Sequence, residues 1–256
     1  MPIPPPPPLP PPVYYPQTTT TNQSSSNANG SIEEGRPVSR QPPIRSPLEM
    51  LYLSLIHNFT QLCLGGVVIS ALIIPLSFPI SVLMQHTVLC TVGYFIIMAQ
   101  GILAYSPVGW ANHLKYDSKK IIHSTMQICG SILAISGSAV IIAETNLTLT
   151  TSHGICGLVA TILTVINLLA GIFNMFFNRT RKLILLKILH ICLGALTISV
   201  AIIALILAFD LYYRQVNGDT NANLAIALSV FALCGILLMA LLNNKAGNHR
   251  PLEAYH

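Results

Sequence analysis

Six long runs of apolar residues constrain this chain more than any other feature. Each is about 20 residues long, the length that a helix needs to cross the roughly 30 Å hydrocarbon layer of a bilayer. No Asp, Glu, Lys or Arg interrupts any of them. They lie at about 58–80, 82–104, 121–143, 153–173, 188–209 and 222–242. Because lipid offers no hydrogen-bond partner to an open backbone, these runs predict an all-α, polytopic membrane protein with six transmembrane helices.

The distribution of positive charge predicts the orientation of these helices. Cytoplasmic segments of membrane proteins are enriched in Lys and Arg. If the N-terminus is inside, both termini are cytoplasmic and the opposite side carries Arg214 alone. The inside then carries twelve basic residues, which are Arg36, Arg40, Arg45, Lys115, Lys119, Lys120, Arg179, Arg181, Lys182, Lys187, Lys245 and Arg250. The net charge of +5 therefore reflects topology, and nothing in the sequence indicates binding to nucleic acid.

The first 50 residues differ in composition from the rest of the chain. They hold 14 of the 18 prolines and a run rich in Ser, Thr and Asn. Such a segment cannot bury enough apolar surface to fold. We therefore expect a disordered cytoplasmic tail over residues 1–50, a six-helix domain over 51–242 and a short cytoplasmic tail over 243–256. In the first tail, the P-P-V-Y stretch at 11–14 matches a pattern that WW domains bind, and its polyproline context also suits SH3 domains.

The cysteines and the glycosylation sequons fit the same topology. The sequon at Asn146 falls in an outer loop, and the one at Asn178 falls inside, where it should stay unmodified. No C-x-x-C or other metal-binding spacing occurs, so we interpret the cysteines as small buried hydrophobic residues and expect no disulfide. All six lie within the apolar runs, at Cys63, Cys90, Cys129, Cys156, Cys192 and Cys234.

Four histidines lie inside the runs, where an ionisable side chain is costly and therefore a candidate functional residue. One lies near the start of each of the second to fifth runs: His86, His123, His153 and His190. Because successive helices run in opposite directions, the first and third histidines fall toward the outer face. The second and fourth fall toward the inner face. Two face-matched pairs on alternate helices are what two stacked haems would need, with two imidazoles for each iron.

Small residues follow these histidines on the same helix faces, one or two turns along. They are Cys90, Gly93, Gly130, Gly157 and Gly194. A porphyrin could lie close to the backbone there, and iron ligated by two imidazoles favours electron transfer over oxygen chemistry. The alternative is that each histidine is interfacial or bonded to a backbone carbonyl, and that the small residues are ordinary helix-packing positions.

Three local motifs carry a resemblance to a known family. They are K-K-I-I-H-S-T-M-Q at 119–127, S-H-G-I-C-G-L at 152–158 and K-I-L-H-I-C-L-G at 187–194. With six runs and one histidine in each of the four central ones, residues 50–242 resemble the cytochrome b561 family, and most closely its short, domain-containing branch. The resemblance implies a four-helix core that holds two haem b groups, the outer one on His86 and His153 and the inner one on His123 and His190.

The resemblance also implies an activity. Members of this family take electrons from cytoplasmic ascorbate and pass them across the membrane to monodehydroascorbate radical or ferric iron. Lys119 and Lys120 match the basic cluster that receives the anionic donor, and Arg181 could complete that cluster from the following loop. The chain departs from the family at Thr87, where Pro is common, and at Tyr105-Ser106, where ascorbate-using members carry Tyr-Arg. The lysines are therefore open to a second interpretation, as anchors that only set topology.

Other functions and partners stay open at this point. The competing function is a non-catalytic multi-span scaffold, or a small transporter, without haem. A transporter would usually show broken helices and a polar site at the bilayer midplane, whereas here the histidines lie near the ends of the runs. No Ser-His-Asp arrangement, paired carboxylates or phosphate-binding loop indicates other catalysis. The membrane is that of the endoplasmic reticulum, an endolysosomal vesicle or the cell surface, and a homodimer is a further assembly to consider.

Overall fold

The computed structural model describes residues 46–73, 75–77, 79–145, 150–177 and 184–247, and its regular elements are all helical there. The predicted all-α fold is confirmed. The expectations for the N-terminal tail before residue 46, the C-terminal tail after residue 247 and the two sequons lie outside the described residues. In chain order the elements are α1 (Pro47–Ile73), η1 (Pro75–Ser77), α2 (Val82–Cys90), η2 (Thr91–Met98), α3 (Ala99–Leu103), α4 (Tyr116–Thr145), α5 (Ser152–Phe177), α6 (Ile184–Ala208), η3 (Phe209–Tyr213) and α7 (Arg214–Gly247).

The first helix begins at Pro47, well before the expected start near residue 58. Ser46 caps this helix, because the Glu49 N–H donates to its Oγ at 3.2 Å and the Met50 N–H donates to its carbonyl at 3.0 Å. Proline is favoured at the first helical position, and a glutamate three residues after a serine is typical of a capping box. These residues therefore start a helix inside the segment that composition assigned to the tail.

The second apolar run is not one regular helix. Its middle, η2, is a π-helix that separates α2 from α3. Hydrophobic periodicity cannot distinguish such a segment from an α-helix, so the sequence did not predict it. Local π turns are frequent at functional sites. Here the π-helix lies between the element that carries His86 and the element whose main chain bonds His123.

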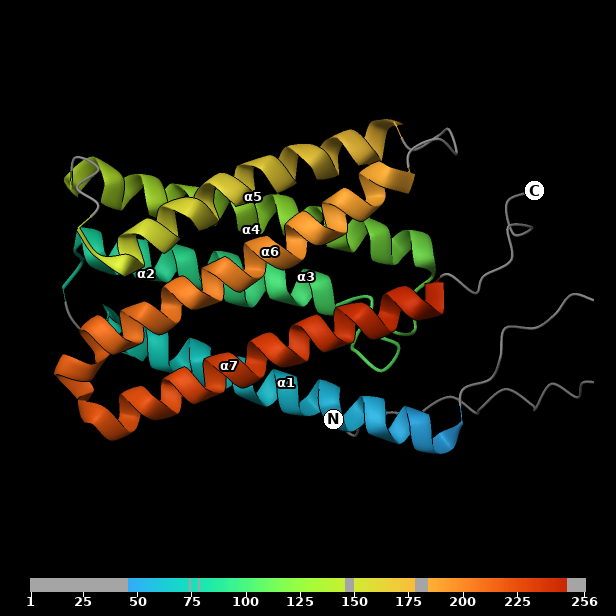
Figure 1. Cartoon of the computed structure of the whole chain (residues 1–256), viewed down its shortest axis with the longest axis horizontal. Helices are drawn as coiled ribbons and strands as arrows, with labels where there is room; N and C mark the ends of the chain where they lie inside the picture. Colours follow the sequence, from blue (N-terminus) through green and yellow to red (C-terminus); the bar gives the residue numbers. More distant parts are fainter. Residues whose placement is uncertain (1–45, 74, 78, 146–149, 178–183, 248–256) are drawn as a thin grey trace, which may run out of the picture. The chain divides into compact units, whose positions relative to one another are not determined.

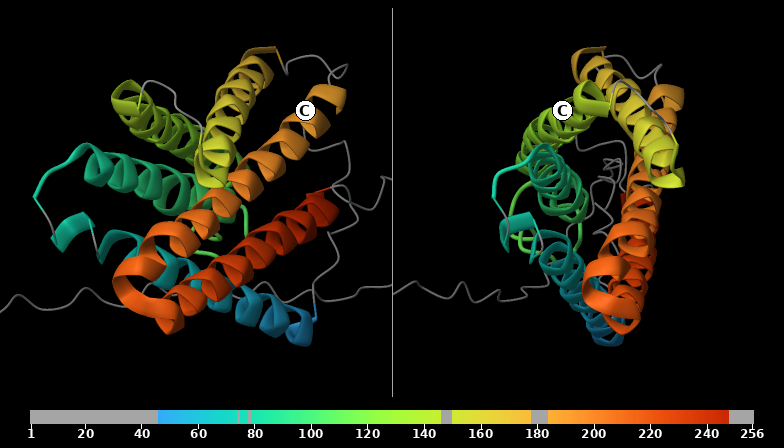
Figure 2. Two further views of the ribbon diagram at one scale, coloured as in Figure 1. Left: turned by 60° about the vertical axis from the view of Figure 1, so that its left-hand side comes forward. Right: turned by 90° about the vertical axis from the view of Figure 1, so that its left-hand side faces the viewer.

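Among the described residues, five helical segments are long and apolar enough to cross a membrane, where the sequence predicted six. The difference arises at the C-terminal end, where one continuous segment, Leu185–Asn243, covers both of the last two predicted runs. This segment contains η3 and a break at Gly218, which has the positive φ of +78° that glycine tolerates best. Its two long parts, α6 and α7, pack against each other and lie side by side (Figure 1, Figure 2).

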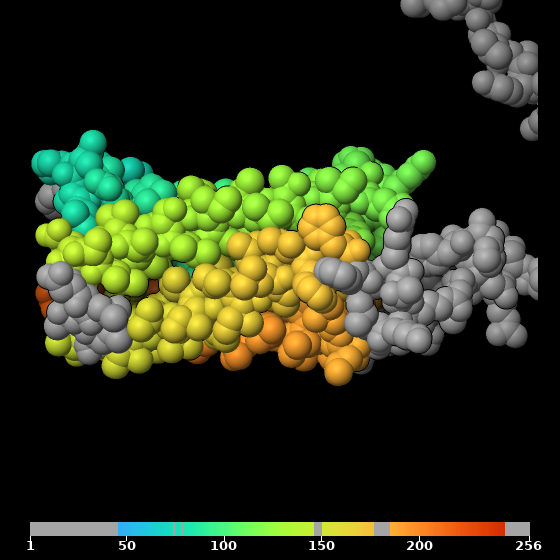
Figure 3. Space-filling model, turned by 90° about the horizontal axis from the view of Figure 1, so that it is seen from above, coloured from blue at the N-terminus to red at the C-terminus, as the bar shows by residue number. Residues whose placement is uncertain are grey.

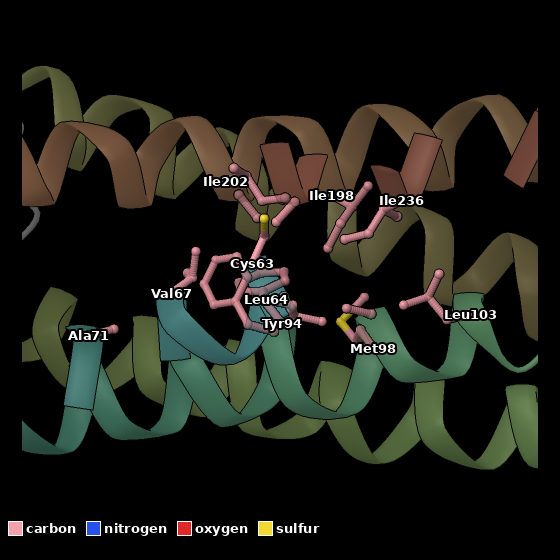
Figure 4. Close-up of a cluster of buried hydrophobic side chains, with 14 of the residues drawn as sticks. Cys63, Leu64, Val67, Ala71, Tyr94, Met98, Leu103, Ile198, Ile202 and Ile236 are labelled. Atoms are coloured by element: carbon pink, nitrogen blue, oxygen red, sulfur yellow. The ribbon is translucent and has the colours of Figure 1, made fainter. Parts of the chain in front are cut away.

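Neighbouring helices pack as pairs and share one apolar core. The main contacts are α5 with α6, α1 with α7, and α4 with α2 and η2. Figure 3 shows α4 and α5 lying against each other along one face. Figure 4 shows the core where α1, η2, α6 and α7 meet, and its buried side chains include Cys63, Leu64, Val67, Tyr94, Met98, Ile198, Ile202 and Ile236.

The outward faces are apolar, as a lipid environment requires. Leu62, Ile162, Leu169 and Leu241 are all at least half exposed. An exposed apolar surface of this extent would be unfavourable in water. The structure therefore supports a multi-pass membrane protein. The cysteines correct one interpretation, because all six are free but only Cys63 is fully buried, while Cys129, Cys192 and Cys234 are exposed on these outward faces.

Candidate functional site

The four candidate histidines come together as two pairs. His86 of α2 lies beside His153 of α5, with 6.0 Å between their ring centres and 78° between their planes. His123 of α4 lies beside His190 of α6, with 6.5 Å and 85°. These are the pairs that the alternating directions of the helices predicted. Both pairs join helices that are not consecutive in the chain, so the bundle as a whole fixes them.

Helix caps fix where the outer pair lies along its helices. Ser81 caps α2, because its Oγ accepts from the Met84 N–H at 3.1 Å, and His86 follows in the next turn. Thr151 does the same for α5, where its Oγ1 accepts from the Gly154 N–H at 3.1 Å. His153 is consequently in the first turn of α5. Serine and threonine are preferred at this position because they satisfy amide groups that the helix leaves unpaired.

Three of the four imidazoles are oriented by the main chain of another element. The Nδ1–H of each donates to a carbonyl: His86 to Gly137 at 2.9 Å, His123 to Gly101 at 2.9 Å and His153 to Ala204 at 2.8 Å. With the hydrogen on Nδ1, the lone pair is on Nε2, which is the form of a neutral histidine that binds a metal. A hydrogen bond from the other ring nitrogen is the usual way in which proteins orient such a ligand.

His190 is held differently. Its ring packs on Gly171 of α5, where a Cβ atom would lie only 3.0 Å from Cε1 of the imidazole. Its Nδ1 is buried near the main chain of Asn167 but completes no hydrogen bond with any residue that the structure describes. A buried polar atom without a partner is costly. Packing against Gly171, more than a hydrogen bond, therefore positions this imidazole.

The small residues near the histidines divide into two groups. A Cβ atom on Gly157 would meet nothing within 4 Å, and one on Gly194 would meet only the side chain of Asn167, at 3.4 Å or more. By contrast, a Cβ atom on Gly93 would lie 2.7 Å from the carbonyl oxygen of Gly130. A Cβ atom on Gly130 would lie 2.8 Å from the carbonyl oxygen of Gly93. The expectation that all of them face a macrocycle is wrong for Gly93 and Gly130, because η2 and α4 approach closely there.

The two pairs fit a group that brings its own in-plane ligands. Each offers two imidazoles, and within the described ranges no three His, Cys, Asp or Glu side chains converge on one point. Two imidazoles on one iron, each bonded at about 2 Å through Nε2, have ring centres about 6 Å apart. The observed 6.0 and 6.5 Å agree with that geometry. The open space at Gly157 also fits an additional group.

Comparison with known proteins decides the family. A family model described as eukaryotic cytochrome b561 matches residues 85–215, which is 131 of the 256 residues and includes all four histidines. The chain belongs to the cytochrome b561 family. No curated protein matched the chain. Members of this family bind haem b and act as transmembrane oxidoreductases, so this cytochrome b561 is a multi-pass membrane protein of electron transfer.

The end of the bundle that holds His123 and His190, which the sequence predicts to be the inner end, carries two of the three predicted donor-binding residues. Lys119 is half-buried and Lys120 is exposed, and both lie in the first turns of α4, just before His123. Arg181 lies outside the described residues, so the structure does not place it. Ser106, which stands where an arginine is typical of the family, is fully buried and offers no charge to a donor.

Two tyrosines near the histidines form a further part of the site. The ring of Tyr105 lies 5.2 Å from that of His123 and 6.1 Å from that of Tyr116. Burial, with a smaller contribution from Tyr116, raises the pKa of Tyr105, so its phenol stays protonated. At the outer end, the ring of Tyr212 lies 6.2 Å from that of His153 at 88°. The signal in the sequence was a tyrosine just after the second run and another just after the fifth run. Sequence alone gave no reason to link either tyrosine to a histidine.

Proposed function

We propose that this cytochrome b561 carries electrons from cytoplasmic ascorbate, through two haem b groups, to an acceptor on the other side of the membrane. The acceptor is monodehydroascorbate radical or ferric iron. The observation that carries the proposal is the presence of two imidazole pairs, one toward each end of the bundle. Their ring centres lie 6.0 and 6.5 Å apart within each pair. One centre near each membrane face would divide a long transfer into short steps.

In this proposal His86 and His153 hold the outer haem, and His123 and His190 hold the inner one. Haem supplies a one-electron centre, which two imidazoles leave without an open position for oxygen. The carbonyls of Gly137, Gly101 and Ala204 hold the imidazoles in the metal-binding tautomer. The apolar helices around the pairs would limit the access of water to them.

The inner end of the proposed path receives the donor. Ascorbate is an anion, and Lys119 and Lys120 would raise its local concentration by electrostatic attraction. Arg181 would add a third positive charge. This placement requires the inner pair to face the cytoplasm, which the excess of Lys and Arg in the inner segments supports.

The proposed topology has six membrane crossings, with both termini cytoplasmic. The break at Gly218 and the packing of α6 against α7 support two crossings within the last long segment. The P-P-V-Y stretch of the N-terminal tail would bind a WW or SH3 domain protein. The host membrane is that of the endoplasmic reticulum, an endolysosomal vesicle or the cell surface, and the protein would work as a monomer or a homodimer.

The test is a spectrum followed by a vesicle experiment. The purified chain should show a strong Soret band, a sharp α-band on reduction and two haems per polypeptide. In sealed vesicles, ascorbate on the cytoplasmic face should reduce ferric citrate on the opposite face. His113→Ala is the matched control, because His113 is exposed in the loop before α4 and should leave both haems in place. A colourless protein would favour the scaffold or transporter and reject the proposal.

A further inference from the structure

The side chain of Tyr212 connects the outer histidine pair with the surface. Its ring meets the imidazole of His153 edge-on, with 6.2 Å between ring centres, and 46% of the residue is exposed. A half-exposed aromatic ring in contact with the partly buried imidazole of His153 is well placed to contact a small molecule that arrives from outside.

The local fold holds Tyr212 in this place. It lies in the π-helix η3, between α6 and α7. Phe209, at the start of η3, is buried and packs against Tyr213 with 5.3 Å between ring centres, which anchors the turn from inside. A π turn re-aims the side chains that follow it. In this turn Phe209 is directed inward, and Tyr212 lies against His153.

A charged clamp closes the same turn from outside. The Arg214 guanidinium donates to Asp210 at 2.7 and 3.0 Å, and to Asp219 at 2.9 Å beyond the break at Gly218. It also donates to Asn223 at 3.0 Å. A planar guanidinium can bridge several acceptors in this way, which a lysine cannot. The clamp ties η3 to the part of α7 after the break and so limits movement of Tyr212.

The inner end has a comparable arrangement of tyrosines next to a histidine. There Tyr105 contacts His123, and the 43% exposed Tyr116 lies next to Tyr105. Each histidine pair thus has one imidazole in contact with a tyrosine. At the outer end this tyrosine, Tyr212, is itself exposed, whereas at the inner end the exposed Tyr116 contacts His123 only through Tyr105. At the outer end a single tyrosine therefore extends from the histidine to the protein surface.

We propose that Tyr212 is the contact through which electrons leave the outer site for the acceptor, which deepens the proposed function and rests on it. The acceptor docks against the exposed edge of the ring and takes up one electron, which reduces ferric iron to ferrous. The electron comes from the side of His153, and Tyr212 ends unchanged. The ring is neither oxidised nor deprotonated, so the aromatic face is needed and the hydroxyl is not.

The test removes the ring and then restores it without the hydroxyl. The full chain with Tyr212→Leu should keep two haems and the electron paramagnetic resonance signature of the outer one. After reduction with dithionite, its reoxidation by ferric citrate on the outer face should slow about tenfold or more, because loss of contact geometry at a reacting group costs on the order of 10- to 100-fold. Tyr212→Phe should restore the rate. Tyr52→Leu, which removes an exposed tyrosine of α1, is the matched control.

Three results would overturn the proposal. The first is a normal reoxidation rate in Tyr212→Leu. The second is loss of the outer haem or a changed resonance signature in that variant, since Tyr212 would then only pack against His153. The third is failure of Tyr212→Phe to restore the rate, since the hydroxyl would then be the active group. Because dithionite replaces ascorbate, the result does not depend on the donor. A wild-type protein without haem would instead reject the proposed function itself.

Discussion

The inner and outer pairs both consist of two histidines, but different interactions hold these histidines in place. In the outer pair, both imidazoles donate to a main-chain carbonyl. In the inner pair only His123 does so, while His190 relies on its packing against Gly171. The outer pair should therefore tolerate changes in packing, whereas the inner pair should depend on the shape of α5 beneath His190.

The charged residues near the two ends differ as well. Lys119 and Lys120 lie at the start of α4, about one helical turn before His123. The charge near the outer pair is Arg214, and its guanidinium is already bonded to Asp210 and Asp219. Two positive charges at the inner end can attract an anion over a distance, whereas Arg214 together with Asp210 and Asp219 carries a net negative charge, so the outer end must rely on contact. The comparison predicts that salt affects electron entry more than electron exit.

The largest expected effect is the loss of one haem by removal of one imidazole. His86→Ala should lower the haem content from two to one, because the two sites share no ligand. The variant should still be reduced by ascorbate from the cytoplasmic side, but should no longer reduce ferric citrate outside. His190→Ala should instead block electron entry and spare the outer haem. The measurements are haem per polypeptide and transmembrane ferric reduction in vesicles.

These two variants also test the independence of the ends. If His86→Ala keeps two haems, then His86 is an interfacial histidine and the outer site is wrong. If either variant loses both haems, then the sites are coupled through folding. A normal amount of protein in the membrane fraction is the control for insertion, since exchange of a polar residue for alanine in a span should not prevent it.

The second prediction separates packing from hydrogen bonding. Gly171→Val should push against the ring of His190, because a Cβ atom there would lie 3.0 Å from Cε1. Overpacked positions typically cost about 1–3 kcal/mol, which corresponds to roughly 5- to 150-fold weaker retention of the inner haem. The outer haem should stay bound, and a haem-extraction titration measures both. Gly65→Ala is the matched control, because a Cβ atom on Gly65 would meet nothing within 4 Å.

Much of this arrangement follows from the sequence. The lengths of the apolar runs predict the helices, and the alternation of their directions predicts which histidines meet. The starts of α2 and α5 follow from Ser81 and Thr151, which cap them. These features are local or depend only on direction, so a single sequence contains them.

Other features depend on how closely two helices approach, which a single sequence does not contain. A glycine permits a close helix contact and a flat cofactor equally well, so Gly93 and Gly157 could not be told apart. The sequences of the π-helices η2 and η3 carry no signal that distinguishes them from α-helix. The carbonyl partners of the histidines are main-chain atoms of other helices, and no side-chain motif marks them.

The third prediction concerns electron entry. Replacing both Lys119 and Lys120 with alanine should slow reduction by ascorbate about tenfold at low ionic strength, because charge can raise association rates by 10-fold or more. Both haems should stay bound. The difference from the wild type should shrink at about 1 M salt, where charges are screened within roughly 3 Å. Stopped-flow reduction at several salt concentrations measures it, and unchanged kinetics at low salt would return these lysines to the role of topology anchors.

The smallest expected effect tests the clamp at the outer end. Arg214→Gln removes the bridge between Asp210 and Asp219, so Tyr212 should move more freely against His153. Exposed ion pairs stabilise proteins little, and we therefore expect electron exit to slow only about two- to threefold. Electron entry should be unchanged. Arg214→Lys should fall between the two, because a lysine can pair with one carboxylate but cannot bridge both. The measurement is reoxidation of the dithionite-reduced protein by ferric citrate, beside Tyr212→Leu. If Arg214→Gln slows exit as strongly as Tyr212→Leu does, then the positive charge, and not the ring that it holds in place, controls the outer end.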